Sequence, residues 1–480
     1  MDHIANLSAV ELRDAIVRRE LCAVEAVDAA LDRISQKRHL NAFISVIADQ
    51  ARAEARNIDA RLLAGDKVGP LAGTPFSAKD LIETESVRTT YGSRFSFDDE
   101  NPPRDAIAVK RTRAAGGVLI GKTTTPEFGH KPLTEAPLFG RTLNPFDATV
   151  TCGGSSGGAA VAVATGMGQL ALGTDGGGSN RIPAACCGVV GLKATVGAIP
   201  NLEVPDLFAS NICVGPLART VDDISLFYSV LFGPDGRDPY GIDKLRAAAL
   251  GAGKEPLRIG WMPKCGNRLN PEIESICGIA IRAAEDMGML IEPVELDFVS
   301  LESAYHAIMR STLAARFSQY IPGCADIFDK TFVKAVMHGA EFSVKDVVDA
   351  NRERTDAFLK IQAIFQRVDV IASPVLSYAP VPVNTEPVGP TRIEGVEMNS
   401  IQGAWYPYTY PFNLSGHPAL SLPCGYTASG LPVGLQLAGR WNEEELLLGL
   451  AKKLEAALSI PNSLKALEGP PRSIDRLSSV

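Results

Sequence analysis

The sequence predicts an α/β protein built around one large β-sheet, and three observations support this fold class. Short apolar runs of strand length, such as 118–123 and 368–372, alternate with amphipathic segments of helix length. Residues 256–296 are predicted to form a strand, a helix and a strand, an order that favours a parallel crossover. The 480 residues contain no internal repeat and no linker, so we expect a single domain over 1–480.

The first part of the chain, 1–65, is expected to be a helical lead-in. A capping box formed by Ser8 and Glu11 begins the first helix. Two further amphipathic helices are predicted over 23–35 and 48–63.

Strands and helices then alternate along the rest of the chain. Strands are expected at 71–84, 118–123, 169–173, 256–261, 290–296, 368–372 and 432–439. Helices are expected at 109–115, 159–164, 221–231, 271–287 and 443–458, together with a mostly helical region over 300–366. An aromatic run at 405–412 is consistent either with core packing or with the wall of a site for an apolar substrate.

The most unusual stretch is 151–193, in which two glycine/serine clusters enclose small apolar residues. The first cluster is GGSSGG at 153–158, and the second is DGGGSNR at 175–181. A flexible linker is polar throughout, whereas Ala/Val/Leu runs join these clusters, so we expect both to be buried turns. A helix that follows glycines directly offers unpaired N–H groups to an oxygen or an anion.

These residues resemble the amidase signature family. The family's signature contains a GGSSGG turn, a TD-x-GGS-x-R segment and a PAA-x-CG-x-x-GLK run, and 151–193 has all three in this order. The resemblance implies that Ser179 is the nucleophile and that Ser155, which follows a cis peptide, relays the proton. It also implies that Lys79 is the third catalytic residue, within the segment GTPFSAKD at 73–80.

The resemblance has consequences for the whole chain. It implies a mixed sheet covered by helices on both faces, with the catalytic core in 71–235. It is weakest between 240 and 400. The variable helical region 300–366 is expected to lie over the active site, where such regions usually set substrate choice.

The chemistry of these residue types can also be argued without the family. A serine hydroxyl is a weak nucleophile until a base takes its proton, yet no histidine lies between His130 and His306. A lysine can act as this base only when it is neutral, so burial must lower its pKa from about 10.4 towards neutrality. Lys79 follows an apolar strand, 76–78, which suits such burial.

Backbone N–H groups of the second cluster are the expected donors to an oxyanion or substrate oxygen: Gly176, Gly177, Gly178 and Ser179. The resemblance implies that Asp175 and Arg181 brace this loop, although an ordinary charged pair in a loop is nearly as good an interpretation. Asn180 stands where the family usually has isoleucine, and we hypothesise that it tunes substrate choice without affecting the chemical step.

Two alternatives remain open at this point. The residues GGSSG at 153–157 also fit the nucleophile elbow of α/β-hydrolases, which would make Ser155 the nucleophile of an esterase, with a later base such as His417. That interpretation leaves the second cluster and Lys79 unexplained. Alternatively, the chain is the glutaminase-type subunit of an amidotransferase complex, which the family includes.

Composition limits the possible partners and the compartment. The net charge of −8 argues against nucleic acid, and no apolar stretch is long enough to span a membrane. The nine cysteines are scattered, which indicates free thiols in the cytoplasm, and Cys152 or Cys187 would make the site sensitive to thiol reagents. We therefore expect a cytoplasmic amidase, acting on linear amides as a homodimer, without a metal or a cofactor.

Overall fold

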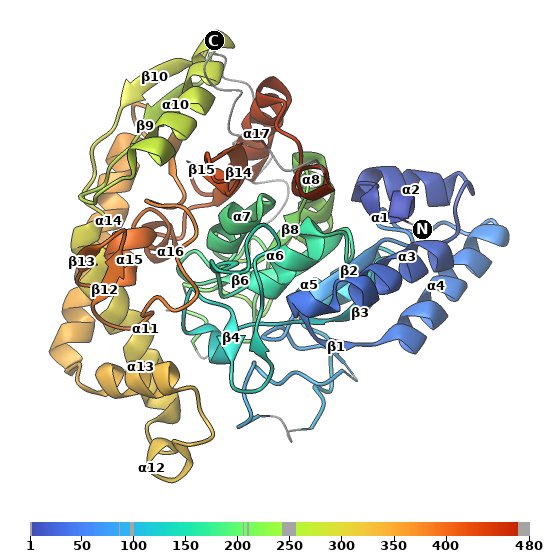
Figure 1. Cartoon of the computed structure of the whole chain (residues 1–480), viewed down its shortest axis with the longest axis horizontal. Coiled ribbons are helices and arrows are strands. Elements are labelled where there is room, and N and C mark those ends of the chain that lie inside the picture. Colours follow the sequence, from blue (N-terminus) through green and yellow to red (C-terminus); the bar gives the residue numbers. More distant parts are fainter. Residues whose placement is uncertain are drawn as a thin grey trace.

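The computed structural model describes residues 2–85, 87–96, 100–204, 206–208, 211–241 and 256–468. Its centre is an 11-stranded sheet in the order β1-β3-β2-β6-β8-β7-β14-β15-β11-β9-β10 (Figure 1). The strands are β1 (Phe43–Val46), β2 (Pro75–Lys79), β3 (Val118–Thr123), β6 (Leu170–Asp175), β7 (Val190–Lys193), β8 (Cys213–Ala218), β9 (Arg258–Trp261), β10 (Leu290–Pro293), β11 (Val370–Pro374), β14 (Ala419–Tyr426) and β15 (Pro432–Ala438). Outside it, β4 (Glu135–Ala136) pairs with β5 (Gly140–Arg141), and β12 (Thr391–Ile393) pairs with β13 (Val396–Met398).

The sheet is mixed, as predicted. β2 pairs in parallel with β3 and β6, and β9 pairs in parallel with β10 and β11. The other neighbouring strands of the sheet are antiparallel. The predicted parallel crossover is present as β9, α10 (Pro271–Asp286) and β10, and Asn270 caps the helix that connects the two strands.

Helices cover both faces of the sheet, as predicted. On β6, Leu170 and Leu172 belong to one core cluster, whereas Ala171 between them belongs to another, which contains residues of α6 and α7. The remaining helices are α1 (Asp2–Asn6), α2 (Ala9–Val17), α3 (Ala23–Gln36), α4 (Ala48–Leu63), α5 (Ile107–Ala114), α6 (Gly157–Ala164), α7 (Arg181–Cys187), α8 (Val221–Leu231), α11 (Glu302–Phe317), α12 (Ile321–Cys324), α13 (Lys330–Ala340), α14 (Val344–Ile364), α15 (Ile401–Trp405), α16 (Tyr410–Leu414), α17 (Glu444–Leu458) and α18 (Ser463–Glu468). Single 3-10 turns lie at Arg38–Leu40, Glu127–Gly129 and Val299–Leu301.

The strand predicted over 71–84 is shorter than expected, because β2 ends at Lys79. The next residue, Asp80, accepts backbone hydrogen bonds from Thr90 at 3.1 Å and from Gly92 at 3.2 Å. These bonds hold the residues after Lys79 in a loop, so the extended strand does not continue. The strands β1, β7, β8 and β14 were not predicted at all.

The predicted helical region 300–366 contains α11 to α14. In Figure 1 these helices lie on the opposite side of the molecule from the N-terminal helices α1 to α4. Within this region, α11 packs against both α13 and α14. The helix α11 places Tyr305 and Met309 against Gly177 and Gly176, which directly follow the interior strand β6.

Candidate active site

Lys79 lies at the carboxyl end of β2, between β3 and β6, and its side chain is fully buried. Its Nζ is 2.7 Å from the Ser155 Oγ, 3.0 Å from the Ser156 Oγ and 2.9 Å from the Thr174 Oγ1. Burial lowers the pKa of Lys79 well below its ordinary value, and the charge of Asp175 only partly opposes this. The buried amine therefore favours its neutral form, which accepts a proton.

The hydroxyl groups around Lys79 differ in the groups to which they can donate a hydrogen bond. The Ser156 Oγ donates to the Asn180 Oδ1 at 3.0 Å or to the Thr174 carbonyl at 3.1 Å. Among the described residues, the Ser155 hydroxyl has Lys79 as its hydrogen-bond partner. In the described ranges the Thr174 hydroxyl also has Lys79 as its partner. Of the two serines beside Lys79, Ser155 is therefore the one that is placed to give its proton to the neutral amine.

Ser155 follows a cis peptide bond from Gly154, at the position where the resemblance implies one. Gly154 lies so close to the backbone of 132–133 that a Cβ would come within 2.8–3.0 Å of it, so only glycine fits. The Ser156 N–H donates to the Ser179 carbonyl at 3.0 Å. This bond joins the two glycine/serine clusters.

Ser179 lies in the turn between β6 and α7 and is half-buried. Together with Ser155 it lines a cavity of about 640 Å³. In the part of the chain that the structure describes, no hydrogen bond joins the two hydroxyls directly. Such bonds are often loose in ligand-free enzymes, and both side chains border the same space.

Asp175 and Arg181 form a fully buried ion pair at the two ends of this turn. The Arg181 Nε is 2.9 Å from the Asp175 Oδ2, and the Arg181 Nη2 is 2.9 Å from the Asp175 Oδ1. Burial alone would raise the pKa of Asp175, but Arg181 holds it below its ordinary value. Arg181 also donates to the Thr409 carbonyl, the Gln436 Oε1 and the Asn413 Oδ1.

Of the three glycines before Ser179, two lie at the cavity and one is bonded within the turn. Gly176 and Gly177 line the cavity. The Gly178 N–H instead donates to the Asp175 Oδ1 at 2.7 Å, and its φ of 122° is one that glycine favours. The expectation that Gly178 donates to an oxyanion is therefore corrected, because this N–H holds the turn in place.

The helix α11 forms a wall of the cavity directly against this turn. A Cβ on Gly177 would lie 2.1 Å from the Tyr305 Oη, and a Cβ on Gly176 would lie 3.5 Å from the Met309 Cε. Tyr305 and Met309 are one helical turn apart, so they share one face of α11. No local pattern in the sequence identified Tyr305, because its contact with Gly177 arises only in the fold.

Comparison with known proteins decides the family. The family model described as Amidase matches residues 25–448. This chain belongs to the amidase signature family. The amidase is 34% identical over 468 residues to an acylamidase of Rhodococcus erythropolis, and the match covers 94% of this chain and 95% of that protein.

Two further comparisons extend this result. The amidase is 33% identical over 479 residues to a glutamyl-tRNA(Gln) amidotransferase subunit of Synechococcus sp. (strain CC9605), covering 93% of this chain and 96% of that protein. Among solved structures it is similar to a bacterial aryl acylamidase of the amidase signature enzymes, with a TM-score of 0.89 and 29% identity. That similarity covers 97% of this chain and 99% of the other.

The aromatic run 405–412 of the amidase is mostly core, with one residue at the cavity. Tyr406 lines the cavity. The other aromatic side chains of the run are buried in the core: Trp405, Tyr408, Tyr410 and Phe412. The run therefore contributes one residue to the cavity, while the rest pack beneath it.

The base proposed for the nucleophile-elbow alternative, His417, is not near Ser155 in the amidase. His417 is buried, its Nδ1 lies 2.9 Å from the Ser415 Oγ, and it does not line the cavity. His130 does line the cavity, but both of its ring nitrogens already contact other groups. The geometry gives Ser155 a lysine partner and no histidine partner.

Asn180 does not line the cavity either. Its Oδ1 accepts the bond from Ser156, and its side chain fits between two strands because Gly173 and Gly215 lack a Cβ. A Cβ on Gly173 would lie 2.2 Å from the Asn180 Oδ1. The hypothesis that Asn180 tunes substrate choice has no support in these contacts, which instead connect Asn180, through Ser156, to Lys79.

The cysteines near the site are buried thiols. Burial raises the pKa of Cys152 to about 12, and it raises the pKa values of Cys186 and Cys187 well above their ordinary value. Because the thiolate is the reactive form, these shifts argue against the expected sensitivity of Cys152 and Cys187 to thiol reagents.

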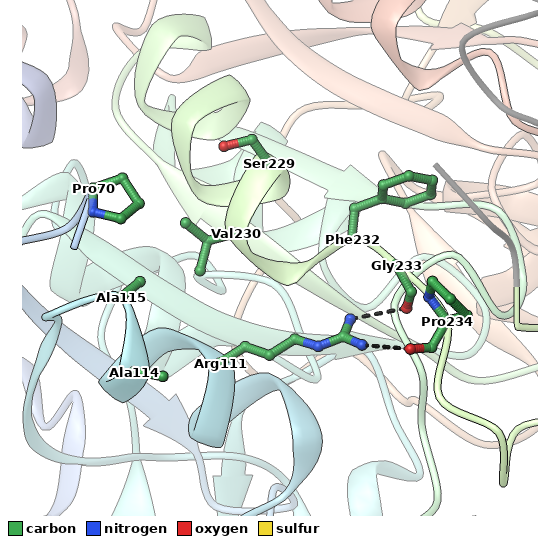
Figure 2. A pocket seen from close by; sticks show the side chains of 9 residues that line it. All are labelled: Pro70, Arg111, Ala114, Ala115, Ser229, Val230, Phe232, Gly233 and Pro234. Carbon is green, nitrogen blue, oxygen red and sulfur yellow. Dashed lines mark hydrogen bonds between the residues drawn. The ribbon is translucent and has the colours of Figure 1, made fainter. Parts of the chain in front are cut away.

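A second hollow, of about 650 Å³, lies between α5 and the end of α8 (Figure 2). The Arg111 guanidinium donates to the carbonyls of Gly233 and Pro234, each at 2.9 Å. Of the described residues that line this hollow, Arg111 is the only titratable one. The hollow therefore lacks the paired groups that acid–base catalysis needs.

The described ranges contain no group of three His, Cys, Asp or Glu side chains arranged to hold a metal ion. Within the same ranges, no helix combines the length and the apolar character needed to cross a bilayer.

Proposed function

We propose that this amidohydrolase converts a small-molecule linear amide to the carboxylic acid and ammonia or an amine, through an acyl-enzyme on Ser179. The observation that carries the proposal is the contact between the buried Lys79 and Ser155, in a cavity that Ser179 also lines. The similarity to an acylamidase and to an aryl acylamidase supports an amide as the substrate.

In the proposed mechanism, neutral Lys79 takes the proton of Ser155 while Ser155 takes the proton of Ser179, which attacks the amide carbonyl. The oxyanion then accepts hydrogen bonds from the N–H groups of Gly176, Gly177 and Ser179. The leaving amine receives the proton back through Ser155. Water hydrolyses the acyl-enzyme by the same relay, and no step requires a metal or a cofactor.

We assign Asp175 and Arg181 a positioning role in this reaction. Their ion pair lies at the two ends of the turn that carries Ser179, and Asp175 also accepts the Gly178 N–H. Fixing this turn fixes the nucleophile and the oxyanion donors together, which is how preorganised sites lower a barrier.

A second candidate function is that of the glutaminase-type subunit of an amidotransferase complex. The identity of 33% to a glutamyl-tRNA(Gln) amidotransferase subunit favours it. The test is ammonia release from glutamine and from simple amides such as hexanamide and benzamide by the purified chain alone. Hydrolysis of simple amides supports the hydrolase, whereas glutamine hydrolysis that needs added partner proteins supports the second function.

The proposed setting is cytoplasmic, without nucleic acid as a partner. The scattered cysteines and the net charge of −8 motivate this proposal. We also propose a homodimer, which light scattering coupled to size-exclusion chromatography tests. A monomeric mass in that measurement contradicts the dimer.

The mechanism is tested by mass spectrometry after reaction with a serine-directed sulfonyl fluoride. We expect the adduct on Ser179, and we expect Lys79→Ala to abolish or strongly slow its formation. Lys122→Ala is the matched control, because Lys122 is also fully buried, on the neighbouring strand β3, but contacts neither serine. An adduct on Ser155, or labelling that does not depend on Lys79, contradicts the mechanism.

A further inference from the structure

Arg310 of α11 carries a positive charge in the wall of the cavity, and only 8% of its surface is exposed. Its hydrogen-bond partners are two imidazoles. The Arg310 Nη2 lies 3.2 Å from the His306 Nε2, and the Nη1 contacts the His338 Nδ1. Among the described residues, no carboxylate forms an ion pair with this guanidinium.

Both imidazoles are neutral acceptors. Burial lowers the pKa of His306 to about 3 and also lowers the pKa of His338, and the charge of Arg310 adds to both effects. The nearest acidic residue on the same helix, Glu302, lies 4.0 Å from the other nitrogen of His306. A neutral imidazole supplies a lone pair but no charge. The charge of Glu302 acts on Arg310 only from a distance, so in the described residues no carboxylate is bonded to the guanidinium.

Arg181, the buried arginine beside Ser179, shows the arrangement that proteins normally use. It pairs with Asp175 through two hydrogen bonds, as expected because an unpaired buried charge is costly. Arg310 has five N–H donors, of which the histidines use two. The donors that remain form a planar fork that matches a carboxylate.

The helix α11 places this charge in the wall of the cavity that the proposed nucleophile, Ser179, also lines. Tyr305 and Met309 contact the glycines before Ser179, and His306 and Arg310 each follow one residue later and line the same cavity. Apolar side chains line it as well, among them Leu81, Ile182, Ile212, Leu313 and Val388. A substrate in this cavity can therefore place an amide at Ser179 and an anion at Arg310, with an apolar segment between them.

We propose that Arg310 binds a carboxylate of the substrate, so that the preferred substrates are amides carrying a carboxylate on a short apolar segment. This inference rests on the proposed amide hydrolysis. Arg310 is a binding residue and takes no part in the proton relay. The carboxylate belongs either to the acyl part or to the amine part of the amide, and the experiment distinguishes the two.

The test compares kcat/KM within two matched pairs of amides. Glutaramate against pentanamide places the carboxylate on the acyl part, and N-pentanoylglycine against N-ethylpentanamide places it on the amine part. Wild type should prefer the carboxylate member of one pair by about 10- to 100-fold, as expected for hydrogen bonds to a charged group. The pair that shows this preference identifies the part that carries the carboxylate.

Variants of Arg310 sharpen the test. Arg310→Gln should raise KM for the preferred amide enough to remove the preference, while the neutral partner changes less than about threefold. Arg310→Lys should restore part of the preference. Arg316→Gln is the matched control. Arg316 is an exposed arginine on the same helix that also lines the cavity, and its loss should leave the preference for the carboxylate amide unchanged.

Equal rates within both pairs in wild type, or equal losses for both members in Arg310→Gln, overturn the assignment of Arg310 and leave amide hydrolysis intact. Failure to hydrolyse any amide instead counts against the proposed function. In that case calorimetry with glutarate decides the role of Arg310. Binding to wild type that Arg310→Gln abolishes supports it, and absence of binding overturns it.

Discussion

Two buried arginines near the cavity, one in the turn that carries Ser179 and one on the helix α11, have opposite kinds of partners. In the turn, Arg181 is fully buried, pairs with Asp175 and donates to three further residues. On α11, the hydrogen-bond partners of Arg310 among the described residues are two neutral imidazoles. The comparison indicates that the turn is organised for fixed geometry, whereas α11 is organised to receive a ligand. The predictions below test this division.

The largest effect is expected from Ser179→Ala. Loss of the proposed nucleophile should lower kcat for every amide by about four to six orders of magnitude. Ser311→Ala on α11 is the matched control, because Ser311 lines the same cavity, and it should change kcat less than about tenfold. Ammonia release measures both, and losses of similar size would contradict the division between turn and helix.

Lys79→Met should lower kcat by about 10²- to 10⁴-fold, because a general base is lost. The control, Lys122→Met, removes a second buried lysine, whose pKa burial lowers to about 8. Its Nζ contacts the Ile82 carbonyl, Thr84 and Thr89, so kcat of the control should stay within about tenfold of wild type. A control as inactive as Lys79→Met, yet folded by circular dichroism, would remove the special role of Lys79.

The lowered pKa of Lys79 also predicts the sign of two pH dependences. Between this pKa and about 10.4, Lys79 is neutral in the folded state and protonated in the unfolded state. The unfolded state then binds more protons, so the contribution of Lys79 to stability rises with pH across this window. The value of kcat/KM should rise as the pH approaches the folded-state pKa of Lys79 from below and level off above it, because the neutral amine is the base. Urea unfolding and rates at several pH values should show both slopes flattened in Lys79→Met, and unchanged slopes would refute the assignment.

Arg181→Met should cost about 3–5 kcal/mol in the free energy of unfolding, because it leaves Asp175 buried and unpaired. Arg310→Gln should cost less, since no carboxylate loses a partner. Arg392→Met breaks an exposed pair with Glu397 and should cost about 0–1 kcal/mol. Urea unfolding measures all three, and a cost for Arg310→Gln equal to that for Arg181→Met would mean that Arg310 has a structural role.

The smallest effect is expected from Asn180→Ile. The change leaves the Ser156 hydroxyl without one of its acceptors, so kcat should fall about tenfold for all amides alike. Ratios of kcat/KM between amides should stay constant, because Asn180 does not line the cavity. A change in these ratios at constant kcat would restore the hypothesis that Asn180 sets substrate choice.

A local pattern in the sequence predicted the crossover, whereas the mixed sheet and the pairing of Lys79 with Ser155 were predicted from the resemblance to the family. The contacts of Lys79 with Ser156 and Thr174 were not predicted. The sequence did not predict β14, whose apolar run is interrupted by Pro423 and by Gly425 at a shift in strand register. It could not show that the Gly178 N–H is used by Asp175, since this depends on the position of one side chain. Arg310 has no local motif, and its meaning comes from which side chains surround it in the fold.

The contacts of Arg181 also set an order of events during synthesis. Its guanidinium donates to residues that follow it by 228, 232 and 255 positions in the chain. A chain is made from its N-terminus. Lys79 and Ser179 therefore leave the ribosome long before Thr409, Asn413 and Gln436, which help to hold the turn that carries Ser179. An unfinished chain therefore contains every proposed catalytic residue and Asp175 but lacks the three later acceptors of Arg181, so activity should begin only when synthesis is nearly complete.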